Sequence, residues 1–501
     1  MTQTRPAEPS APGGGSLRNR VGRRGGRNAA QPGWAGERFG AWLARPLASF
    51  HLIVTIATLL TVLGLVMVLS ASSVEAYAGG GSAYALFIQQ AMFAGLGAIA
   101  FYIALRLPLR LLRQWSFPIF SISVLALVLV LIPGIGAIHG GARRWFDIGP
   151  LSIQPSEVVK VTLVVWGAHL LASRRGAQLK DILVPLVPAG LLVCLLVVLE
   201  PNLSTTIALG IVLMALLWFG GLPVRLFVGI MVTGVVAASV LALSAGYRSD
   251  RVRAFFNPGD DPQGVNYQAR QAKYSLADGG IWGRGLGQSR AKWSYLPNSH
   301  NDFIFAIIGE ELGFLGCMLV LALFALFVYA GIRIALRSVD PFLRLLTATA
   351  TTWITAQALI NIGYVVGLLP VTGLQLPLVS AGGSSLAITL FMFGIIASAA
   401  RHEPEAVSAL QAGQDGRVSR MLRLPVPEVY TPFKADAPRR SASKARAERP
   451  RPAARRESPA PRRRRAPQSR GTSSLRSTRA WEPTYPMPHR PVKRRAGGGD
   501  A

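Results

Sequence analysis

The feature that most constrains this chain is a series of ten long apolar segments. Most of them reach the length of about 20 residues that an α-helix needs to cross roughly 30 Å of hydrocarbon. Half of the 501 residues are hydrophobic and only 15% are charged, which is unusual for a soluble protein. The pattern predicts an all-α integral membrane protein with about ten transmembrane helices, at 50–71, 86–106, 117–133, 153–173, 182–199, 203–220, 223–245, 303–331, 345–367 and 376–399.

The two ends of the chain differ in composition from this apolar middle. Residues 1–48 are rich in Gly, Ala, Pro and Arg, and residues 401–501 are rich in Pro, Ala, Ser and Arg. Such segments cannot bury a core, so we expect two disordered basic tails around a membrane domain at 49–400. They lack a folded module and aromatic platforms. Their charge therefore favours anionic membrane lipids or acidic protein segments as partners, and not nucleic acid.

The loop charges predict the orientation of the chain. An even number of spans puts both tails on one side of the membrane. The short loops on that side are basic and include Arg106, Arg174 and Arg337, which indicates the cytoplasmic side. The outer side then receives a loop at 134–152 and a long loop at 246–302 between the seventh and eighth spans.

The junction between the long loop and the eighth span carries a carboxylate, Asp302. A turn around Pro297 precedes it, and the apolar run begins at Phe303. Asp302 has two interpretations: an N-cap of the helix, or a functional carboxylate at the membrane surface. Glu310 and Glu311 follow at membrane depth, where ionisable side chains are costly and usually functional. This setting favours the functional interpretation.

Both outer loops are basic, against the usual charge bias. The first carries Arg143 and Arg144 beside Trp145, and the second includes Arg248 and Lys292. One interpretation is a solvated basic face with a tryptophan of the aromatic belt. The other is a group of guanidinium donors that binds a phosphate, with the tryptophan ring beside it.

A polar segment with helical spacing lies in the middle of the long loop and includes Tyr267 and Gln268. A glycine-rich run at 279–287 follows it. This run lacks the preceding strand and the lysine of a nucleotide-binding loop, so we expect no nucleotide cofactor. Glycines that let the main chain approach a bulky ligand remain an interpretation.

Two further motifs place polar residues at helix ends. Glu157 and Lys160 are three residues apart in the fourth span, so they share a helix face and are expected to pair. The segment 380–384 interrupts the last span with Ser and Gly. Its N–H groups would suit an anion, or its small residues would allow close helix packing.

These motifs resemble signatures of the SEDS family (shape, elongation, division and sporulation), and most of all its division-type branch. The resemblance rests on YLPNSHNDFIFAIIGEELG at 295–313, on GARRW at 141–145 with QPSE at 154–157, and on the run 369–385. It covers the chain apart from the two tails. Asn202, Ser294 and Asn298 stand where the family often has acidic residues, which concentrates any acid/base role on Asp302.

The resemblance implies a peptidoglycan glycosyltransferase that polymerises lipid II at the outer face of the cytoplasmic membrane, at the division septum. Asp302 would be the general base, or a ligand of a loosely held Mg²⁺ or Mn²⁺. The implied partners are a class B penicillin-binding protein and other division proteins. A lipid II flippase and a non-catalytic scaffold remain alternatives. The residues expected to bind substrate are Arg143, Arg144, Trp145, Arg248, Tyr267, Gln268, Lys292, His300, Ser380, Gly382, Gly383 and Ser384. Those expected to supply structural or cavity charge are Glu157, Lys160, Glu310 and Glu311.

Overall fold

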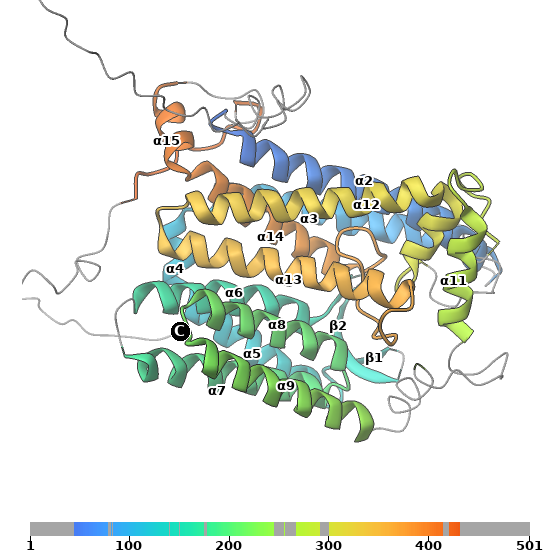
Figure 1. The fold of residues 1–501 in the computed structure, drawn as a ribbon, viewed down its shortest axis with the longest axis horizontal. Helices are drawn as coiled ribbons and strands as arrows, with labels where there is room; N and C mark the ends of the chain where they lie inside the picture. Colours follow the sequence, from blue (N-terminus) through green and yellow to red (C-terminus); the bar gives the residue numbers. More distant parts are fainter. Residues whose placement is uncertain are drawn as a thin grey trace, which may run out of the picture. The chain divides into compact units, whose positions relative to one another are not determined.

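The computed structural model describes residues 45–78, 82, 84–139, 141–149, 151–174, 178–244, 255, 267–290, 300–413 and 420–430. The chain divides into two compact units, Met1–Ala437 and Pro438–Ala501. All described residues belong to the first unit, which is a bundle of helices (Figure 1).

Each predicted span corresponds to a helix of this bundle. The helices are α2 (Ala48–Ala78), α3 (Ala85–Arg106), α5 (Ser116–Leu131), α6 (Pro155–Ser173), α7 (Leu179–Leu199), α8 (Leu203–Phe219), α9 (Val224–Ser244), α12 (Ile304–Arg337), α13 (Pro341–Val365) and α14 (Ser384–Arg401). By length and composition, α2, α3, α6, α12 and α14 could each cross a membrane, and α5, α7, α8 and α9 are shorter apolar helices. The remaining helix of the ten, α13, packs in the interior of the bundle. It contains several buried Thr residues and also carries Gln357 and Asn361.

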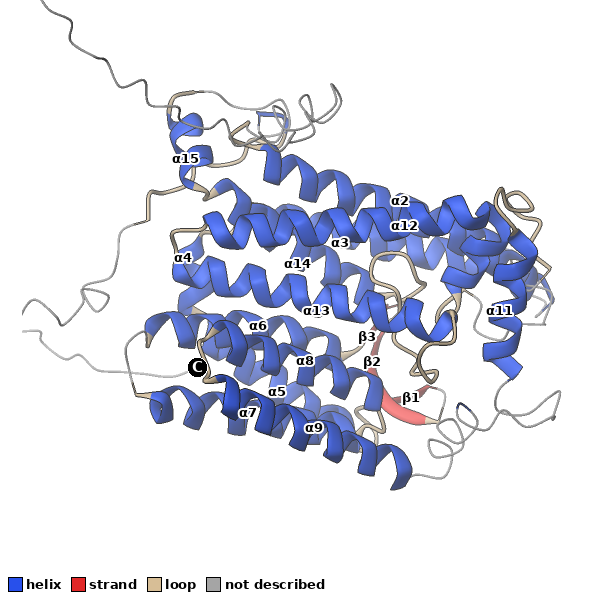
Figure 2. Ribbon diagram, in the orientation of Figure 1, coloured by secondary structure: helices blue, strands red, loops and turns tan. Residues whose placement is uncertain are grey.

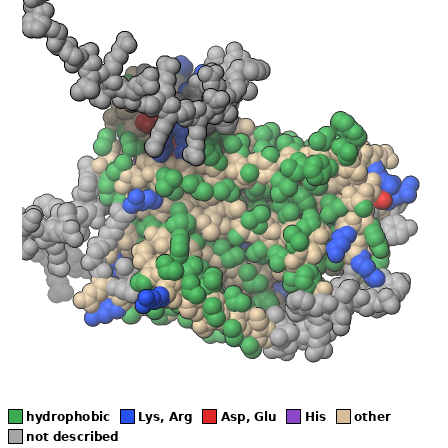
Figure 3. Space-filling model, viewed as in Figure 1, with side chains coloured by type: hydrophobic (Ala, Val, Ile, Leu, Met, Phe, Trp, Pro, Cys, Tyr) green, Lys and Arg blue, Asp and Glu red, His purple; other side chains and the backbone are tan. Residues whose placement is uncertain are grey.

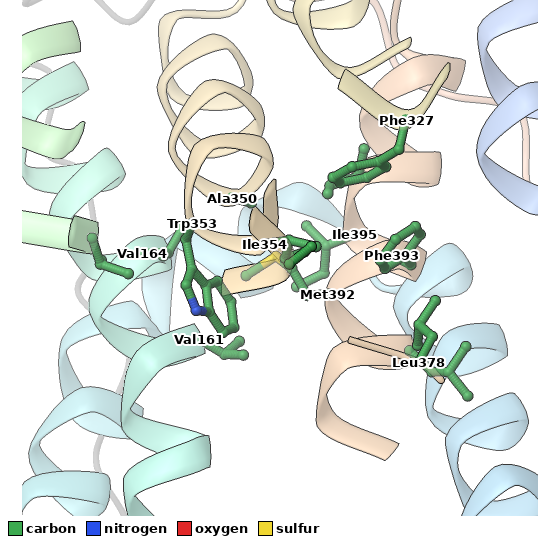
Figure 4. Close-up of a cluster of buried hydrophobic side chains, with 14 of the residues drawn as sticks. Val161, Val164, Phe327, Ala350, Trp353, Ile354, Leu378, Met392, Phe393 and Ile395 are labelled. Atoms are coloured by element: carbon green, nitrogen blue, oxygen red, sulfur yellow. The ribbon is translucent and has the colours of Figure 1, made fainter. Parts of the chain in front are cut away.

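Close helix contacts and a few large side chains build the core. A Cβ atom at Gly97 of α3 would lie 2.5 Å from Leu390 Cδ1, and one at Gly394 of α14 would lie 2.7 Å from Phe101 O. Small residues therefore let α3 and α14 approach closely, as is common between membrane helices. Figure 4 shows a buried cluster nearby, to which α13 contributes Trp353.

A small antiparallel sheet lies at one end of the bundle (Figure 2). Its strands β1 (Ala137–His139), β2 (Ala142–Ile148) and β3 (Leu151–Ile153) pair in chain order. Ile138 pairs with Arg143 and Asp147 with Ser152. The prediction of an all-α fold holds for the bundle and is wrong for this loop. Two of its three strands have only three residues, which leaves too short an alternating pattern to detect.

The two ends of the bundle carry different elements. We call the end with the sheet, α11 (Tyr267–Gly279) and Asp302 the loop end. The opposite end, with α4 (Leu109–Gln114) and α15 (Pro404–Gln411), is the tail end (Figure 1). Figure 3 shows Lys and Arg side chains mostly near the two ends and hydrophobic side chains between them. This distribution suits a bundle that spans a membrane.

The predicted boundary of the C-terminal tail at residue 401 is too early. Helix α15 buries Ala406 and Leu410, and the segment 420–430 returns to the tail end. There Arg401 Nη2 donates to Pro425 O at 2.9 Å. Sequence reasoning missed this packing, because Arg, Pro and Glu interrupt the apolar residues of the segment and leave no helical period.

Candidate active site

Asp302 lies at the loop end, just before α12. The N-cap position of α12 is occupied by Phe303, whose side chain makes no capping hydrogen bond, so Asp302 stands one residue before the N-cap. The main chain of Asp302 is held by α13. Its carbonyl oxygen accepts hydrogen bonds from Asn361 Nδ2 at 3.0 Å and from Tyr364 Oη at 2.8 Å.

The same two side chains also hold the loop between α13 and α14. Asn361 Nδ2 lies 2.7 Å from Leu374 O, and Tyr364 Oη lies 2.8 Å from it. Beside Leu374, Gly373 has φ of +79°, and a Cβ atom there would lie 3.4 Å from Asp302 Oδ2. The carboxylate of Asp302 therefore faces Gly373, and the Asn361–Tyr364 network fixes the main chain on both sides of this contact.

A second junction joins this loop to α8 and to the predicted site residue His300. Ser204 Oγ, in the first turn of α8, donates to Thr372 O. The carbonyl of His300 accepts from Ala381 N at 3.0 Å. The structure thus brings Ser204, the segment 300–302 and the loop 366–383 together from three parts of the sequence.

The segment 380–384 is closed by side chains of neighbouring elements. Gln90 of α3 accepts from Gly382 N and Gly383 N, both at 3.3 Å, and donates to Ser380 O at 3.1 Å. Ser384 Oγ accepts from Gln154 N at 3.3 Å. The N–H groups that the sequence suggested for an anion therefore bond to Gln90. The last helix begins at Ser384 and not near residue 376, because this irregular loop precedes it.

The arginines of β2 bond to main-chain carbonyls at helix ends. Arg144 Nε donates to Glu200 O at 2.9 Å and Nη2 to Pro201 O at 3.0 Å, beyond the end of α7. Arg143 Nη1 donates to Leu131 O at 3.3 Å, at the end of α5. Both arginines thus contribute to the fold at the loop end.

Trp145, the next residue of β2, lies beside an ion pair on the sheet. Its ring meets that of His139 edge to face at 6.2 Å. His139 Nε2 lies 3.0 Å from Asp147 Oδ2. The hydrogen bonds from Ser152 and His139 hold the pKa of Asp147 below its usual value.

Glu200 is a buried carboxyl group at the loop end that sequence reasoning did not propose for the site. It follows α7 directly, its residue is fully buried, and neither carboxyl oxygen has a hydrogen-bond partner among the described residues. Burial raises its pKa to about 8, although the positive charge of Arg144 opposes the shift. The next turn begins with Asn202, whose side chain accepts from Thr205 N at 3.3 Å and caps α8. An acidic residue between Leu199 and Pro201 was the available signal.

The predicted pairing of Glu157 with Lys160 is confirmed. Lys160 Nζ lies 2.9 Å from Glu157 Oε1 and 5.0 Å from the centre of the Trp353 ring. Lys160 is only 1% exposed. A buried charge of this kind needs such partners, so the pair contributes to the packing of α6 against α13.

Glu310 and Glu311 bind the segment 280–290, which follows α11 and is called here the elbow. Glu310 accepts from Ser289 Oγ at 2.7 Å and from Arg290 N at 2.6 Å. Glu311 accepts from Ser70 Oγ of α2 at 2.6 Å. Both glutamates are 1% exposed. Their carboxylates therefore join the elbow and α2 to α12, which is a structural role, one of the two expected for them.

The remaining predicted site residues fall at or beyond the edges of the described chain. Tyr267 and Gln268 form the start of α11, which confirms the helical spacing noted there. Arg248 and Lys292 lie outside the described residues. Within the described ranges, no group of three or more His, Cys, Asp or Glu residues could hold a metal ion.

Known proteins resemble this chain over nearly all of the bundle. Residues 50–405 match the model of the cell cycle protein family of FtsW, RodA and SpoVE. The probable peptidoglycan glycosyltransferases FtsW of Mycobacterium tuberculosis and Mycobacterium bovis are each 56% identical over 419 residues, which are 83% of this chain and 80% of theirs.

Two solved structures share the fold. A chain of a peptidoglycan synthase complex that coordinates polymerization and crosslinking is 29% identical, with a TM-score of 0.57 over 70% of this chain and 97% of its own. RodA of Thermus thermophilus is 28% identical, with a TM-score of 0.54 over 73% of this chain and 99% of its own. This chain therefore belongs to the SEDS family of cell cycle proteins and is a peptidoglycan glycosyltransferase of the FtsW type.

Proposed function

We propose that this protein polymerises lipid II into glycan strands at the loop end of the bundle, on the outer face of the cytoplasmic membrane, during septal wall synthesis. The observation that carries the proposal is the setting of Asp302. It is a carboxylate at the end of a transmembrane helix, it faces a glycine, and its main chain is fixed by Asn361 and Tyr364.

In the proposed reaction Asp302 is the general base. The carboxylate takes the proton from a sugar hydroxyl of the acceptor as that oxygen attacks the anomeric carbon of the donor. The new glycosidic C–O bond forms, the bond from that carbon to the lipid diphosphate breaks, and the diphosphate leaves with the electron pair. Inversion at the carbon follows from attack opposite the leaving group. A positioned base of this kind contributes roughly 10²- to 10⁴-fold in rate.

The diphosphate of the donor needs positive charge close to the membrane surface. Arg143 and Arg144 lie at the loop end, and guanidinium groups suit phosphate oxygens. Arg248 and Lys292, outside the described residues, belong to the same proposal. A Mg²⁺ or Mn²⁺ would receive one carboxylate, from Asp302, and would depend on diphosphate oxygens and water for its other ligands. No step above requires it.

The partner of this activity would be a class B penicillin-binding protein. The similarity to a chain of a peptidoglycan synthase complex supports such a transpeptidase packed against the helices. We also propose that both tails face the cytoplasm. The described chain begins at residue 45 and ends at residue 430 on the tail end, consistent with an even number of crossings.

The test is lipid II polymerisation by the full chain with its transpeptidase in liposomes. Asp302→Asn keeps the size of the side chain and removes the base, so glycan product should fall roughly 10²- to 10⁴-fold. The matched control is Asp278→Asn on α11, where a half-exposed carboxylate pairs with Arg284 at 3.1 Å. This control should polymerise at the wild-type rate.

Two outcomes would reject the proposal. One is near-normal polymerisation by folded Asp302→Asn. The other is a wild-type protein that moves lipid II across the liposome membrane but makes no polymer, which would favour a flippase. Absence of both activities in a complex that still assembles would point to a scaffold.

A further inference from the structure

The elbow exposes large apolar side chains at the loop end. Ile281 is 62% exposed, Trp282 80% and Leu286 55%. They are close in sequence and follow the buried Gly279 at the end of α11. A group of exposed apolar side chains of this size usually marks a surface that another apolar phase covers. The position of the elbow along α12 shows whether membrane lipid can be the apolar phase that covers these side chains.

Along α12, exposed side chains begin just after the residues that the elbow contacts. From Ile304 to Gly313 no residue of α12 is exposed. Immediately after, Phe314 is 59% and Leu315 49% exposed, and exposed apolar residues continue as far as Leu336 at 77%. The protein therefore covers the first part of α12 on all sides, and the rest presents an apolar strip to its surroundings.

The length of this strip matches a membrane. Phe314 and Arg333 are 19 residues apart, which is roughly 28 Å along an α-helix. The hydrocarbon layer is about 30 Å thick. Since Arg333 and Arg337 place charge near the tail end of the strip, Phe314 lies close to the opposite border of the hydrocarbon.

Main-chain hydrogen bonds fix the elbow at the level of Phe314. Phe314 N donates to Gly280 O at 2.9 Å, and Arg284 N donates to Glu310 O at 2.9 Å. The contact requires a break in α12 at Gly313, with φ of +69°, where a Cβ atom would lie 2.3 Å from Gly283 N. The break leaves carbonyl oxygens of α12 without hydrogen-bond donors from the helix itself. N–H groups of the elbow donate to these oxygens. Irregular main chain at membrane depth is tolerated when it is satisfied in this way.

We infer that the elbow is seated in the lipid interface at the loop end, with Ile281, Trp282 and Leu286 in contact with membrane lipid. Tryptophan suits this position, because its ring is apolar and its N–H can reach the head groups. If the proposed function is correct, the anchored elbow also fixes the depth of the first part of α12, which begins just after Asp302. The inference itself holds whichever side of the membrane the loop end faces.

The experiment measures depth directly. In the full chain, Cys194 and Cys317 are replaced by Ala, single cysteines are placed at positions 282 and 286, and each carries a nitroxide label. The protein is reconstituted alone in liposomes of phosphatidylethanolamine and phosphatidylglycerol. Electron paramagnetic resonance then compares access of oxygen, which enters the bilayer, with access of a water-soluble nickel chelate. Lys273→Cys on the exposed side of α11 is the aqueous control, and Val232→Cys on α9 is the control within the span.

The expected oxygen-to-nickel ratio at positions 282 and 286 is several-fold higher than at position 273 and approaches that at position 232. Equal ratios at 282 and 273 would overturn the inference. Equal ratios that diverge only after the transpeptidase is added would also overturn it, in favour of a protein partner on the elbow. The measurement uses no lipid II, so its failure is distinct from failure of the proposed activity.

Discussion

The surroundings of Asp302 and the tail end of the bundle are held together by different interactions. Around Asp302, neutral side chains bond to the main chain: Gln90 holds the segment before α14, and Asn361 holds Asp302 and Leu374. At the tail end, opposite charges meet. Arg113 of α4 pairs with Asp340 at the start of α13, and the same end contains ion pairs of Arg337 with Glu403 and Glu405.

The difference follows from what each end has to do. A neutral amide or hydroxyl can hold irregular main chain in place without adding charge beside a carboxylate that must take up a proton. The tail end contains no proposed site residue, so charge pairs can join its helices. Changes at the loop end should therefore reduce turnover in folded protein, and changes at the tail end should reduce folding without affecting turnover.

After Asp302→Asn itself, the largest effect is expected for Asn361→Leu. The change removes the amide donor to the carbonyls of Asp302 and Leu374 and leaves the bond from Tyr364 Oη, so the main chain of Asp302 is held less firmly and its carboxylate can shift. A displacement of about 1 Å at a reacting group can cost on the order of 100-fold in rate. We expect polymerisation to fall about 10- to 100-fold, mainly in kcat, while the folded complex with the transpeptidase persists.

Thr355→Val is the matched control for this change. Thr355 also lies on α13, and its buried hydroxyl has no hydrogen-bond partner among the described residues. The variant should keep wild-type turnover. If Asn361→Leu kept normal turnover as well, the network would serve only the fold.

The next effect is at the tail end. Arg113→Gln leaves Asp340 as a buried carboxylate without its main partner, because Asp340 is only 6% exposed. Removing one member of a buried pair typically costs roughly 3 kcal/mol. Thermal unfolding in detergent should therefore begin at lower temperature, while turnover per folded molecule stays within about twofold of wild type. Asp340→Asn should cost less, since an amide oxygen can still accept from Phe342 N and cap α13. A loss of turnover in the folded fraction would remove the distinction between the two ends.

Sequence patterns predicted the helices well and their interruptions poorly. A membrane helix needs a long apolar run, so the ten spans follow from hydropathy. The last helix was predicted to begin near residue 376, because Leu376, Leu378 and Val379 are apolar. In the structure they belong to an irregular loop that is held by Gln90, some 290 residues away in sequence. Such a contact leaves no local pattern.

The candidate site, like the helices, could be predicted only in part. The position of Asp302 at a polar junction was visible in the sequence. Its two supports were not, since Asn361 and Tyr364 are single polar residues on a helix that otherwise packs in the core. The ion pair of Glu157 with Lys160 was predictable because its members are three residues apart on one helix. The hydrogen bond between Glu310 and Ser289 could not be predicted, because only the folded structure brings these residues together.

A smaller effect is expected from Glu200, and it depends on pH. Its pKa rises from 4.5 to about 8 on folding, so between these values the folded protein binds more protons than the unfolded protein. The free energy of unfolding must then decrease as pH rises through this range. Glu200→Gln stays neutral at every pH and should remove this decrease. The melting temperatures at pH 5 and pH 8 should differ more for the wild type than for the variant. Equal differences for the two proteins would show that Glu200 is ionised in the folded protein.

The smallest effect is expected for the pair of Arg110 and Glu428, which joins the segment 420–430 to α4. The ion pair spans 3.2 Å, but its side chains are 82% and 72% exposed. Water screens such a pair, and it contributes about 0–1 kcal/mol. The segment has other contacts at the tail end, including the bond from Tyr102 Oη to Leu422 O at 3.3 Å. A double-mutant cycle of Arg110→Ala and Glu428→Ala should therefore give a coupling energy below about 1 kcal/mol and leave turnover unchanged. A larger coupling would mean that this segment, unlike an ordinary exposed tail, stabilises the tail end through its charges.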